Sequence, residues 1–223
     1  MTVKTPHSEE AARRAVVAAA QRMSALGLSP GRSGNVSVRI GDGLLITPSG
    51  VAYEELTPKS IVRVEADGAV PGRQLKPSSE TPFHRAVYAA RPDVGAVVHT
   101  HSMNATVLAC AHRPIPAFHY MIAAAGGADI PCVPYATFGS EDLSRHVAAG
   151  LRERNACLMA NHGAIAVGGT VEEALELAAT VEMLATQYVA LLSIGGPVHV
   201  LDADEMARVI AKFRTYGQRA QKV

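Results

Sequence analysis

The sequence has few cysteines, and no two of them share a metal-binding spacing. Cys110, Cys132 and Cys157 lie at unrelated positions among apolar neighbours. An odd number of cysteines without a Cys-x-x-Cys motif argues against a disulfide framework and against a thiolate zinc site. We therefore expect three free, buried thiols, as is typical of a protein from a reducing compartment.

Long runs of like charge and long apolar runs are also missing. The 223 residues include 21 Lys+Arg and 20 Asp+Glu, which gives a formal net charge of +1. This balance argues against a nucleic-acid-binding surface or a polybasic membrane surface. Glu9 and Glu10 lie where a signal peptide needs its apolar core, and no uninterrupted apolar stretch is long enough to span a membrane. We expect a cytoplasmic protein.

The common signatures of nucleotide-binding and hydrolytic enzymes are absent. The segment from Gly31 to Gly34 lacks the third glycine of a dinucleotide fingerprint, and no Gly-x-x-x-x-Gly-Lys-Ser/Thr motif occurs. No His-Glu-x-x-His helix and no Gly-x-Ser-x-Gly elbow occurs either. Any catalytic site must therefore be built from other residues.

The chain does contain enough apolar sequence for one large core. It is 48% hydrophobic and 18% charged, and no linker or repeat divides it, so we predict a single domain over residues 1–223. Hairpin signals are mixed with helical segments, and this mixture argues against a simple all-parallel βαβ array. The pattern favours a layered α/β domain with a largely antiparallel or mixed sheet covered by helices.

Local signals place several elements. Strands are predicted at 36–40, 44–47 and 61–65, with the first two joined by the turn at 41–43. Ser8 caps a predicted helix that Gly27 ends, and a second helix is predicted from about 79 to 91. A capping box from Thr170 to Glu173 opens a long helix that ends at 195–197, and Asp202 opens a last helix that Gly217 closes.

Two histidines follow an apolar run at a spacing of two. His99 and His101 end the segment 94–101, and a third histidine, His162, stands in the segment 160–163. Because residues i and i+2 of a strand face the same side, the first two imidazoles can meet at one point. Three neutral nitrogens with an open fourth position describe a catalytic zinc site, although paired histidines at a strand end can also simply be solvated.

Three loops of small residues, at 33–35, 47–50 and 76–79, could present backbone amides and hydroxyls to an anion. Each could also be an ordinary turn. Glu80 follows the third loop, in the first turn of the predicted helix, where a carboxylate is favoured by the helix dipole alone. If the loops bind a phosphate and the histidines a metal, Glu80 lies between them and is a candidate general base.

These segments together resemble the class II aldolase/adducin family. The likeness extends from about residue 11 to residue 217, in the same order, and covers nearly the whole chain. Within the family it points to the aldolases that cleave L-fuculose 1-phosphate. The segments that carry it are SGNVSV at 33–38, ITPSG at 46–50, PSSE at 77–80, VVHTH at 97–101, HYMIAAAGG at 119–127, PYATFG at 134–139, NHG at 161–163 and KFRTYG at 212–217.

The resemblance implies a three-layer α/β/α fold and a zinc site. His99, His101 and His162 match the three zinc ligands. Glu80 matches the acid/base that also occupies the fourth metal position when substrate is absent. The positions that match the phosphate-binding residues are Gly34, Asn35, Ser49, Gly50, Ser78 and Ser79.

The resemblance also implies a cyclic homotetramer with active sites at the subunit interfaces. Tyr120 matches a tyrosine that reaches the aldehyde end of the site from the adjoining subunit, and Phe138 and Tyr216 match residues beside that end. The implied reaction is the reversible cleavage of a ketose 1-phosphate to dihydroxyacetone phosphate and a short aldehyde such as L-lactaldehyde. Zinc acts as the Lewis acid, Glu80 as the base of the condensation, and Tyr120 as the proton donor to the aldehyde oxygen.

Other activities of the same scaffold stay open. They are cleavage of 5-deoxyribulose or methylthioribulose 1-phosphate, 4-epimerisation of a pentulose phosphate, dehydration, and non-catalytic binding of the adducin kind. Ser49, Asn161 and the pair Thr81-Pro82 depart from the familiar pattern. Ser49 keeps a hydroxyl, whereas the other two departures leave the metal site intact and the exact sugar open. The remaining histidines, which we expect to be structural or solvated, are His7, His84, His112, His119, His146 and His199.

Overall fold

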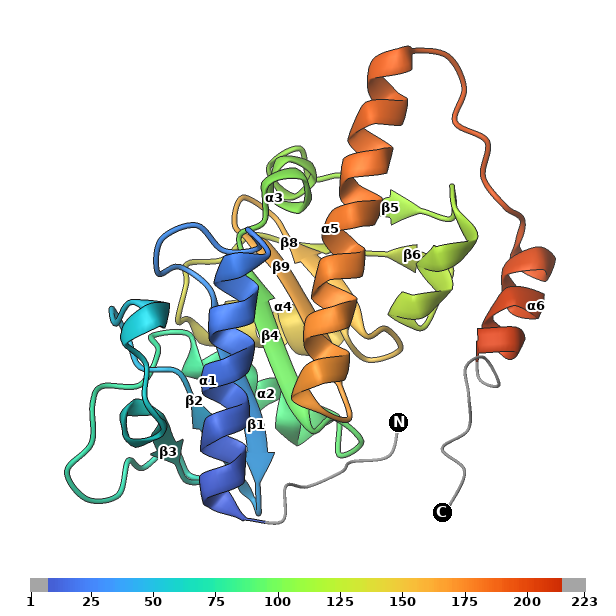
Figure 1. Cartoon of the computed structure of the whole chain (residues 1–223). Coiled ribbons are helices and arrows are strands. Elements are labelled where there is room, and N and C mark those ends of the chain that lie inside the picture. The colour runs from blue at the N-terminus through green and yellow to red at the C-terminus, as the bar shows by residue number, and fades with distance from the viewer. Residues whose placement is uncertain (1–7, 214–223) are drawn as a thin grey trace, which may run out of the picture.

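The structure is a computed structural model that describes residues 8–213. A seven-stranded sheet lies at its centre, in the order β3-β2-β1-β4-β9-β8-β7 (Figure 1). Only β7 and β8 pair in parallel, so the expectation of a largely antiparallel or mixed sheet is confirmed. The strands are β1 (Asn35–Ile40), β2 (Gly43–Ile46), β3 (Val62–Val64), β4 (Ala96–Thr100), β7 (Cys132–Val133), β8 (Ala156–Met159) and β9 (Gly163–Gly168).

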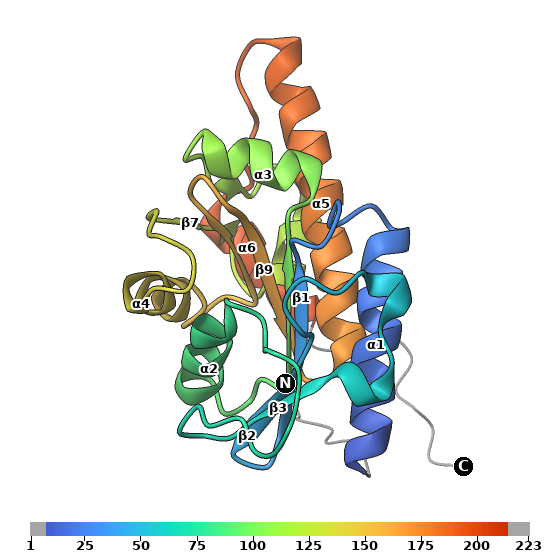
Figure 2. The ribbon, with the colours of Figure 1, turned by 90° about the vertical axis from the view of Figure 1, so that its left-hand side faces the viewer.

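Helices cover both faces of this sheet. Seen along its edge, α1 (Glu9–Ala25) and α5 (Val171–Ile194) lie on one side, and α2 (Thr81–Ala90) and α4 (Glu141–Gly150) on the other (Figure 2). This is the three-layer α/β/α arrangement. The remaining elements are the helices α3 (Met103–Cys110) and α6 (Ala203–Phe213), the 3-10 turns η1 (Tyr53–Glu55), η2 (Pro58–Ser60) and η3 (Tyr120–Ala125), and the two-stranded sheet of β5 (Ile115–Pro116) and β6 (Asp129–Ile130).

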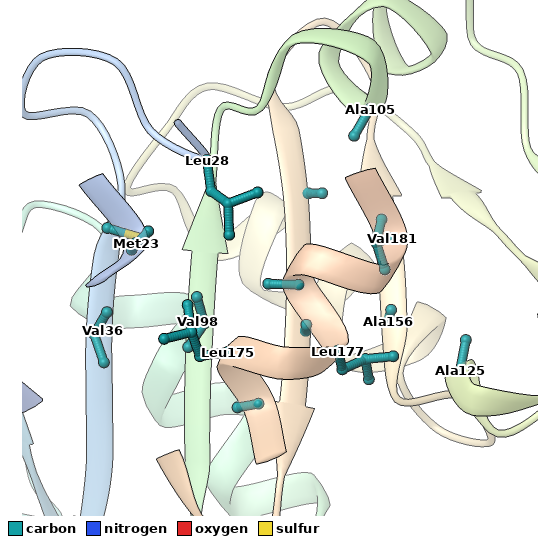
Figure 3. Close-up of a cluster of buried hydrophobic side chains, with 14 of the residues drawn as sticks. Met23, Leu28, Val36, Val98, Ala105, Ala125, Ala156, Leu175, Leu177 and Val181 are labelled. Carbon is teal, nitrogen blue, oxygen red and sulfur yellow. The ribbon is translucent and has the colours of Figure 1, made fainter. Parts of the chain in front are cut away.

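Strand alternation divides the apolar side chains between two cores. Val36 and Val98 point to the α1–α5 side, where they are buried with Met23 and Val181 (Figure 3). Val97, between Ala96 and Val98, is buried in the second core, beneath α2 and α4. Because side chains alternate along a strand, the odd-numbered residues of β1 and β4 face α2. This alternation therefore decides which face of the sheet carries the polar side chains of β1 and β4.

The long helix α5 is capped nearly as expected. The Thr170 side chain accepts a hydrogen bond from the Glu173 amide at 3.2 Å. The Glu173 carboxylate reaches the Gly169 amide at 2.9 Å, one residue before the amide that a standard capping box uses. Among the described residues, α5 alone is long and apolar enough to cross a membrane, but it packs on β4 and β9 as a core helix of the α/β/α layers.

Two sequence-based expectations need correction, and a third concerns a residue outside the described part of the chain. The helix predicted from about 79 begins at Thr81, so Glu80 occupies the N-cap position and not the first turn. The reason is a tight turn in which the amide and hydroxyl of Thr81 both donate to the Ser78 carbonyl. All three thiols are free, but Cys157 alone is buried, while Cys132 is half-buried and Cys110 is exposed. The closing residue of the last helix, Gly217, lies outside the described residues.

Candidate active site

The end of β4 and the turn between β8 and β9 bring three histidines together. His99 belongs to β4 and His101 follows its last residue, and their Nε2 atoms lie 2.9 Å apart. His162 comes from the β8–β9 turn, and one ring nitrogen of each histidine lies within 4.8 Å of the others. The convergence expected from the His-x-His spacing is confirmed. His162 joins the other two histidines because β9 pairs with β4, with Thr100 opposite Ala164.

The turn that carries His162 is tightly constrained. Asn161 has φ +54°, in the left-handed region that asparagine tolerates better than most residues. Gly163 lies so close to the site that a Cβ there would stand 2.4 Å from the Thr100 carbonyl oxygen and 2.9 Å from His101 Cδ2. The backbone of this turn therefore fixes the distance between His162 and the β4 histidines.

A backbone hydrogen bond orients His99, and burial acts on His101. His99 Nδ1 lies 2.9 Å from the Ala164 carbonyl oxygen, which can only accept, so Nδ1 donates to it and the ring is held with Nε2 towards the other histidines. Burial, assisted by the neighbouring His99 and His162, lowers the pKa of His101 to about 3. His101 is therefore neutral at pH 7, as ligation demands.

Glu80 completes the cluster from the N-cap of α2. Its Oε2 lies 3.1 Å from His99 Nε2, and its Oε1 lies 3.0 Å from His162 Nε2. Burial by itself raises the pKa of Glu80, but the adjacent His99 and His162 outweigh it and hold the pKa well below its usual range. Glu80 is therefore a buried, ionised carboxylate.

These groups fit a divalent metal ion. Glu80 Oε1 is buried and makes no hydrogen bond, although it lies close to His162. An unpaired buried carboxylate oxygen is costly unless a cation compensates it. Three imidazole nitrogens with a carboxylate beside them are the donor set of a catalytic zinc site. His99, His101 and His162 would hold the ion, with Glu80 at the fourth position.

The three small-residue loops meet beside this cluster. The Ser49 amide donates to the Lys76 carbonyl at 3.0 Å, which joins the second loop to the third. The Arg32 guanidinium donates to the Gly50 carbonyl at 2.8 Å, which joins the first loop to the second. The structure thus places side by side the three loops that carry the predicted phosphate-binding positions, and of these positions Ser79 lines the cleft over the cluster. The positions are Gly34, Asn35, Ser49, Gly50, Ser78 and Ser79.

A cleft of about 360 Å³ opens over the cluster. Glu80, His101 and His162 form its floor, and Ser33 and Ser79 contribute from two of the loops. This volume is in the range of small-molecule sites. A ligand in the cleft would touch the candidate metal ligands and the small-residue loops at once.

Aromatic side chains and one cation complete the cleft. Phe138 lines it, as the sequence predicts, and is 64% exposed. Tyr135 and Arg32 line it too, and the sequence analysis missed both. Tyr135 lies in the quoted segment 134–139, and a cation in the first small-residue loop was the available signal for Arg32.

The predicted site residue Tyr120 lies away from the cleft of its own chain. Tyr120, the first residue of η3, is 52% exposed, stacks on His119, and is not among the residues that line the cleft of its own chain. Tyr216 lies outside the described residues. Of the histidines expected to be structural or solvated, His112 bonds to Asn161, His119 caps η3 and His199 is exposed.

His84 is fully buried on α2, and its ring bonds to Asn35 and Ser37. Burial lowers the pKa of His84 to about 3, so this imidazole is neutral. The Asn35 side chain also contacts the site, because its Nδ2 donates a hydrogen bond to Glu80 Oε2 at 2.8 Å. The available sequence signal was the spacing of four between Glu80 and His84, which places both on one face of a helix.

Comparison with known proteins assigns the chain to a family. The sequence profile described as "Class II Aldolase and Adducin N-terminal domain" matches residues 14–189. The chain belongs to the class II aldolase family. Class II aldolases are metal-dependent lyases, and the group of His99, His101 and His162 could bind such a metal.

Individual relatives share almost the whole length. A 5-methylthioribulose-1-phosphate/5-deoxyribulose-1-phosphate aldolase from Rhodospirillum rubrum is 54% identical over 97% of both chains. An L-fuculose phosphate aldolase from Escherichia coli strain K12 is 50% identical over 94% of this chain and 97% of its own. A solved structure of an L-fuculose 1-phosphate aldolase superposes with a TM-score of 0.88, at 34% identity, over 91% of this chain and 96% of its own.

Proposed function

We propose that this aldolase cleaves ketose 1-phosphates with an apolar end, reversibly, to dihydroxyacetone phosphate and a short aldehyde. L-Fuculose 1-phosphate, 5-deoxyribulose 1-phosphate and 5-methylthioribulose 1-phosphate are the candidate substrates, and L-lactaldehyde is the aldehyde from the first. The observation that carries the proposal is the convergence of the three histidines and Glu80 at one cleft, whose lining also includes Ser33 and Ser79 from two of the small-residue loops.

The two ends of the cleft suit the two halves of such a substrate. Ser79 lines the cleft, Ser78 lies beside it in the third loop and Ser49 in the adjoining loop, and Arg32 adds the positive charge that a phosphate dianion favours. Tyr135 and Phe138 form an apolar wall at the cleft. A wall of this kind accepts a methyl or methylthio group and excludes neither strongly.

The resident ion is proposed to be zinc, one per subunit, held by His99, His101 and His162. When bound, it would polarise the substrate carbonyl as a Lewis acid. In the condensation direction, Glu80 takes a proton from the hydroxymethyl carbon of dihydroxyacetone phosphate, and the electron pair of that C–H bond moves towards the carbonyl. The resulting nucleophilic carbon attacks the aldehyde, whose oxygen receives a proton. Cleavage reverses these steps.

The proton donor to the aldehyde oxygen is proposed to be Tyr120 of a neighbouring subunit in a homotetramer. Tyr120 is half-exposed and does not line the cleft of its own chain, so it is available to a second copy. Tyr216 is proposed to lie at the same end. We also propose a cytoplasmic location, in keeping with three free thiols.

A substrate panel tests the proposal. We expect coupled detection of dihydroxyacetone phosphate to show cleavage of L-fuculose 1-phosphate and of both pentulose 1-phosphates. Their kcat/KM values should lie within about 200-fold of one another, since a methylene in an apolar pocket discriminates by about 1–3 kcal/mol. A preference for unphosphorylated sugars would overturn the phosphate assignment, and loss of water without fragmentation would point to a dehydratase.

A further inference from the structure

A line of buried polar side chains leads from Glu80 into the layer between β1 and α2. Asn35 Nδ2 donates to Glu80 Oε2 at 2.8 Å, and Asn35 Oδ1 lies 2.5 Å from His84 Nε2. On the other side of the ring, Nδ1 lies 2.7 Å from Ser37 Oγ, which lies 2.8 Å from the Tyr88 hydroxyl. All five side chains are buried. We call Asn35, Ser37, His84 and Tyr88 the Glu80 network.

Secondary structure alone aligns this network. Asn35 and Ser37 are two residues apart on β1 and so face the same side of the sheet, towards α2. Glu80, His84 and Tyr88 follow one another at intervals of four, which places them along one face of α2. The polar side chains of β1 therefore lie opposite those along α2, and Glu80 lies at one end of the two rows.

The charge of Glu80 sets the direction of every hydrogen bond in the network. A carboxylate can only accept, so Asn35 must turn its NH₂ group towards Glu80 and its carbonyl towards His84. His84 Nε2 must then be the protonated nitrogen. Because the ring is neutral, Nδ1 is an acceptor, which obliges the Ser37 hydroxyl to donate to it.

The last link follows in the same way. The Ser37 hydroxyl hydrogen is used on His84, so the Tyr88 hydroxyl donates to Ser37 Oγ. Every hydrogen bond from Tyr88 to Glu80 is thus donated in the same direction, towards the carboxylate. If the ring took its other tautomer, the Asn35 carbonyl would face the carboxylate, and two acceptors would lie 2.8 Å apart in a buried place.

We propose that His84 is a positioning residue for the aldol reaction, which fixes the Asn35 amide so that Glu80 Oε2 is held by a hydrogen bond and Oε1 is left to carry the substrate proton. The proposal rests on Glu80 acting as the acid/base proposed above. Oε1 is the oxygen without a hydrogen bond, and the cleft is lined by Glu80. His84 itself touches neither the cleft nor the histidine cluster through any of its hydrogen bonds.

The first test is independent of catalysis. Nitrogen-15 NMR of histidine-labelled, metal-free protein reports which ring nitrogen of each histidine is protonated, and the His84 signals are assigned by their loss in His84→Gln. We expect the tautomer with the proton on Nε2. A proton on Nδ1 would overturn the proposal, because the Asn35 amide would then be turned away from Glu80.

The second test measures proton transfer in the zinc-loaded enzyme. We expect Ser37→Ala and His84→Leu to slow the exchange of the dihydroxyacetone phosphate hydroxymethyl proton with D₂O by about 10–100-fold, the usual effect of losing an outer hydrogen-bond partner. KM and zinc content should stay near wild type, because neither residue lines the cleft. His84→Gln keeps an N–H donor and should recover part of the rate.

Ser144→Ala is the matched control for Ser37→Ala. Ser144 is a buried serine on α4 whose hydroxyl bonds to the Ser140 carbonyl, outside the network. Its exchange rate should equal that of wild type. Equal exchange rates in Ser37→Ala and Ser144→Ala would overturn the positioning role. A Ser37→Ala variant in which only KM changed would overturn it too. Absence of exchange in the wild-type enzyme would contradict the proposed function instead, and the tautomer would still decide the direction of the network.

Discussion

At the scale of the residue, Glu80 combines two properties that rarely occur together. It is buried, yet the neighbouring His99 and His162 keep its pKa well below the usual range. It also keeps one oxygen free of hydrogen bonds. An ionised carboxylate whose Oε1 accepts no hydrogen bond, fixed at a helix N-cap beside three histidines, is placed to take up and return a proton.

Replacing this carboxylate tests that role. Glu80→Gln keeps the size of the side chain and removes its basicity, so we expect kcat to fall by about 10²–10⁴-fold. Exchange of the dihydroxyacetone phosphate proton should be abolished, while zinc content is largely kept. Glu176→Gln, on the exposed face of α5, is the control and should behave as wild type. Wild-type exchange in Glu80→Gln would remove Glu80 from the reaction.

At the scale of the element, the β8–β9 turn sets the geometry of the metal site. A methyl group at Gly163 would collide with the Thr100 carbonyl and the His101 ring, both of which belong to the site. We expect Gly163→Ala to lower zinc affinity by about 10-fold or more, which corresponds to a displacement energy of about 1.4 kcal/mol. Competition with a chromogenic chelator measures this affinity.

Gly27→Ala provides the matched control. Gly27 has φ +69° at the end of α1, where a Cβ meets no other atom within 4 Å. This variant should lose about 1 kcal/mol of unfolding free energy without any change in zinc affinity. If both variants bound zinc like wild type, the turn would not control the site.

Elements also differ in how far the sequence predicts them. The β1–β2 hairpin is predictable because an alternating segment precedes the turn at 41–43 and a short apolar segment follows it. Strands β8 and β9 are buried along their whole length, so they show no alternation and escaped prediction. The pair His99 and His101 follows from strand geometry, whereas the arrival of His162 depends on the pairing of β4 with β9, a contact between distant segments that spacing cannot reveal.

At the scale of the whole molecule, a buried neutral histidine couples stability to pH. His84 has a pKa of about 3 in the folded protein against 6.5 in a model peptide, and burial is the main cause. Between these values the unfolded chain binds a proton that the folded chain does not. Stability therefore falls as the pH decreases from about 6.5 towards 3.

Urea unfolding of the metal-free protein measures this coupling. From pH 7.5 to pH 5.0, His84 alone should remove about 2 kcal/mol of unfolding free energy. His84→Gln removes the titrating group, so its loss over the same interval should be smaller by that amount. An equal loss in both proteins would show that His84 is not buried in its neutral form.

The proposed tetramer adds a second property of the whole molecule. If Tyr120 serves the cleft of a neighbour, mixing inactive Glu80→Gln subunits with weakened Tyr120→Phe subunits should restore part of the activity. Some interfaces of the hybrid then join an intact Glu80 to an intact Tyr120. Sedimentation measures the assembly and confirms subunit exchange. No recovery in verified hybrids would count against a shared site.

The central claim is that three histidines hold a metal ion on which cleavage to dihydroxyacetone phosphate depends. The most direct measurement compares dihydroxyacetone phosphate release from L-fuculose 1-phosphate and 5-deoxyribulose 1-phosphate by native, chelator-stripped and zinc-reloaded protein. We predict near-stoichiometric zinc in the native protein, loss of release on stripping, and recovery on reloading. Full activity after exhaustive removal of the metal would contradict the account.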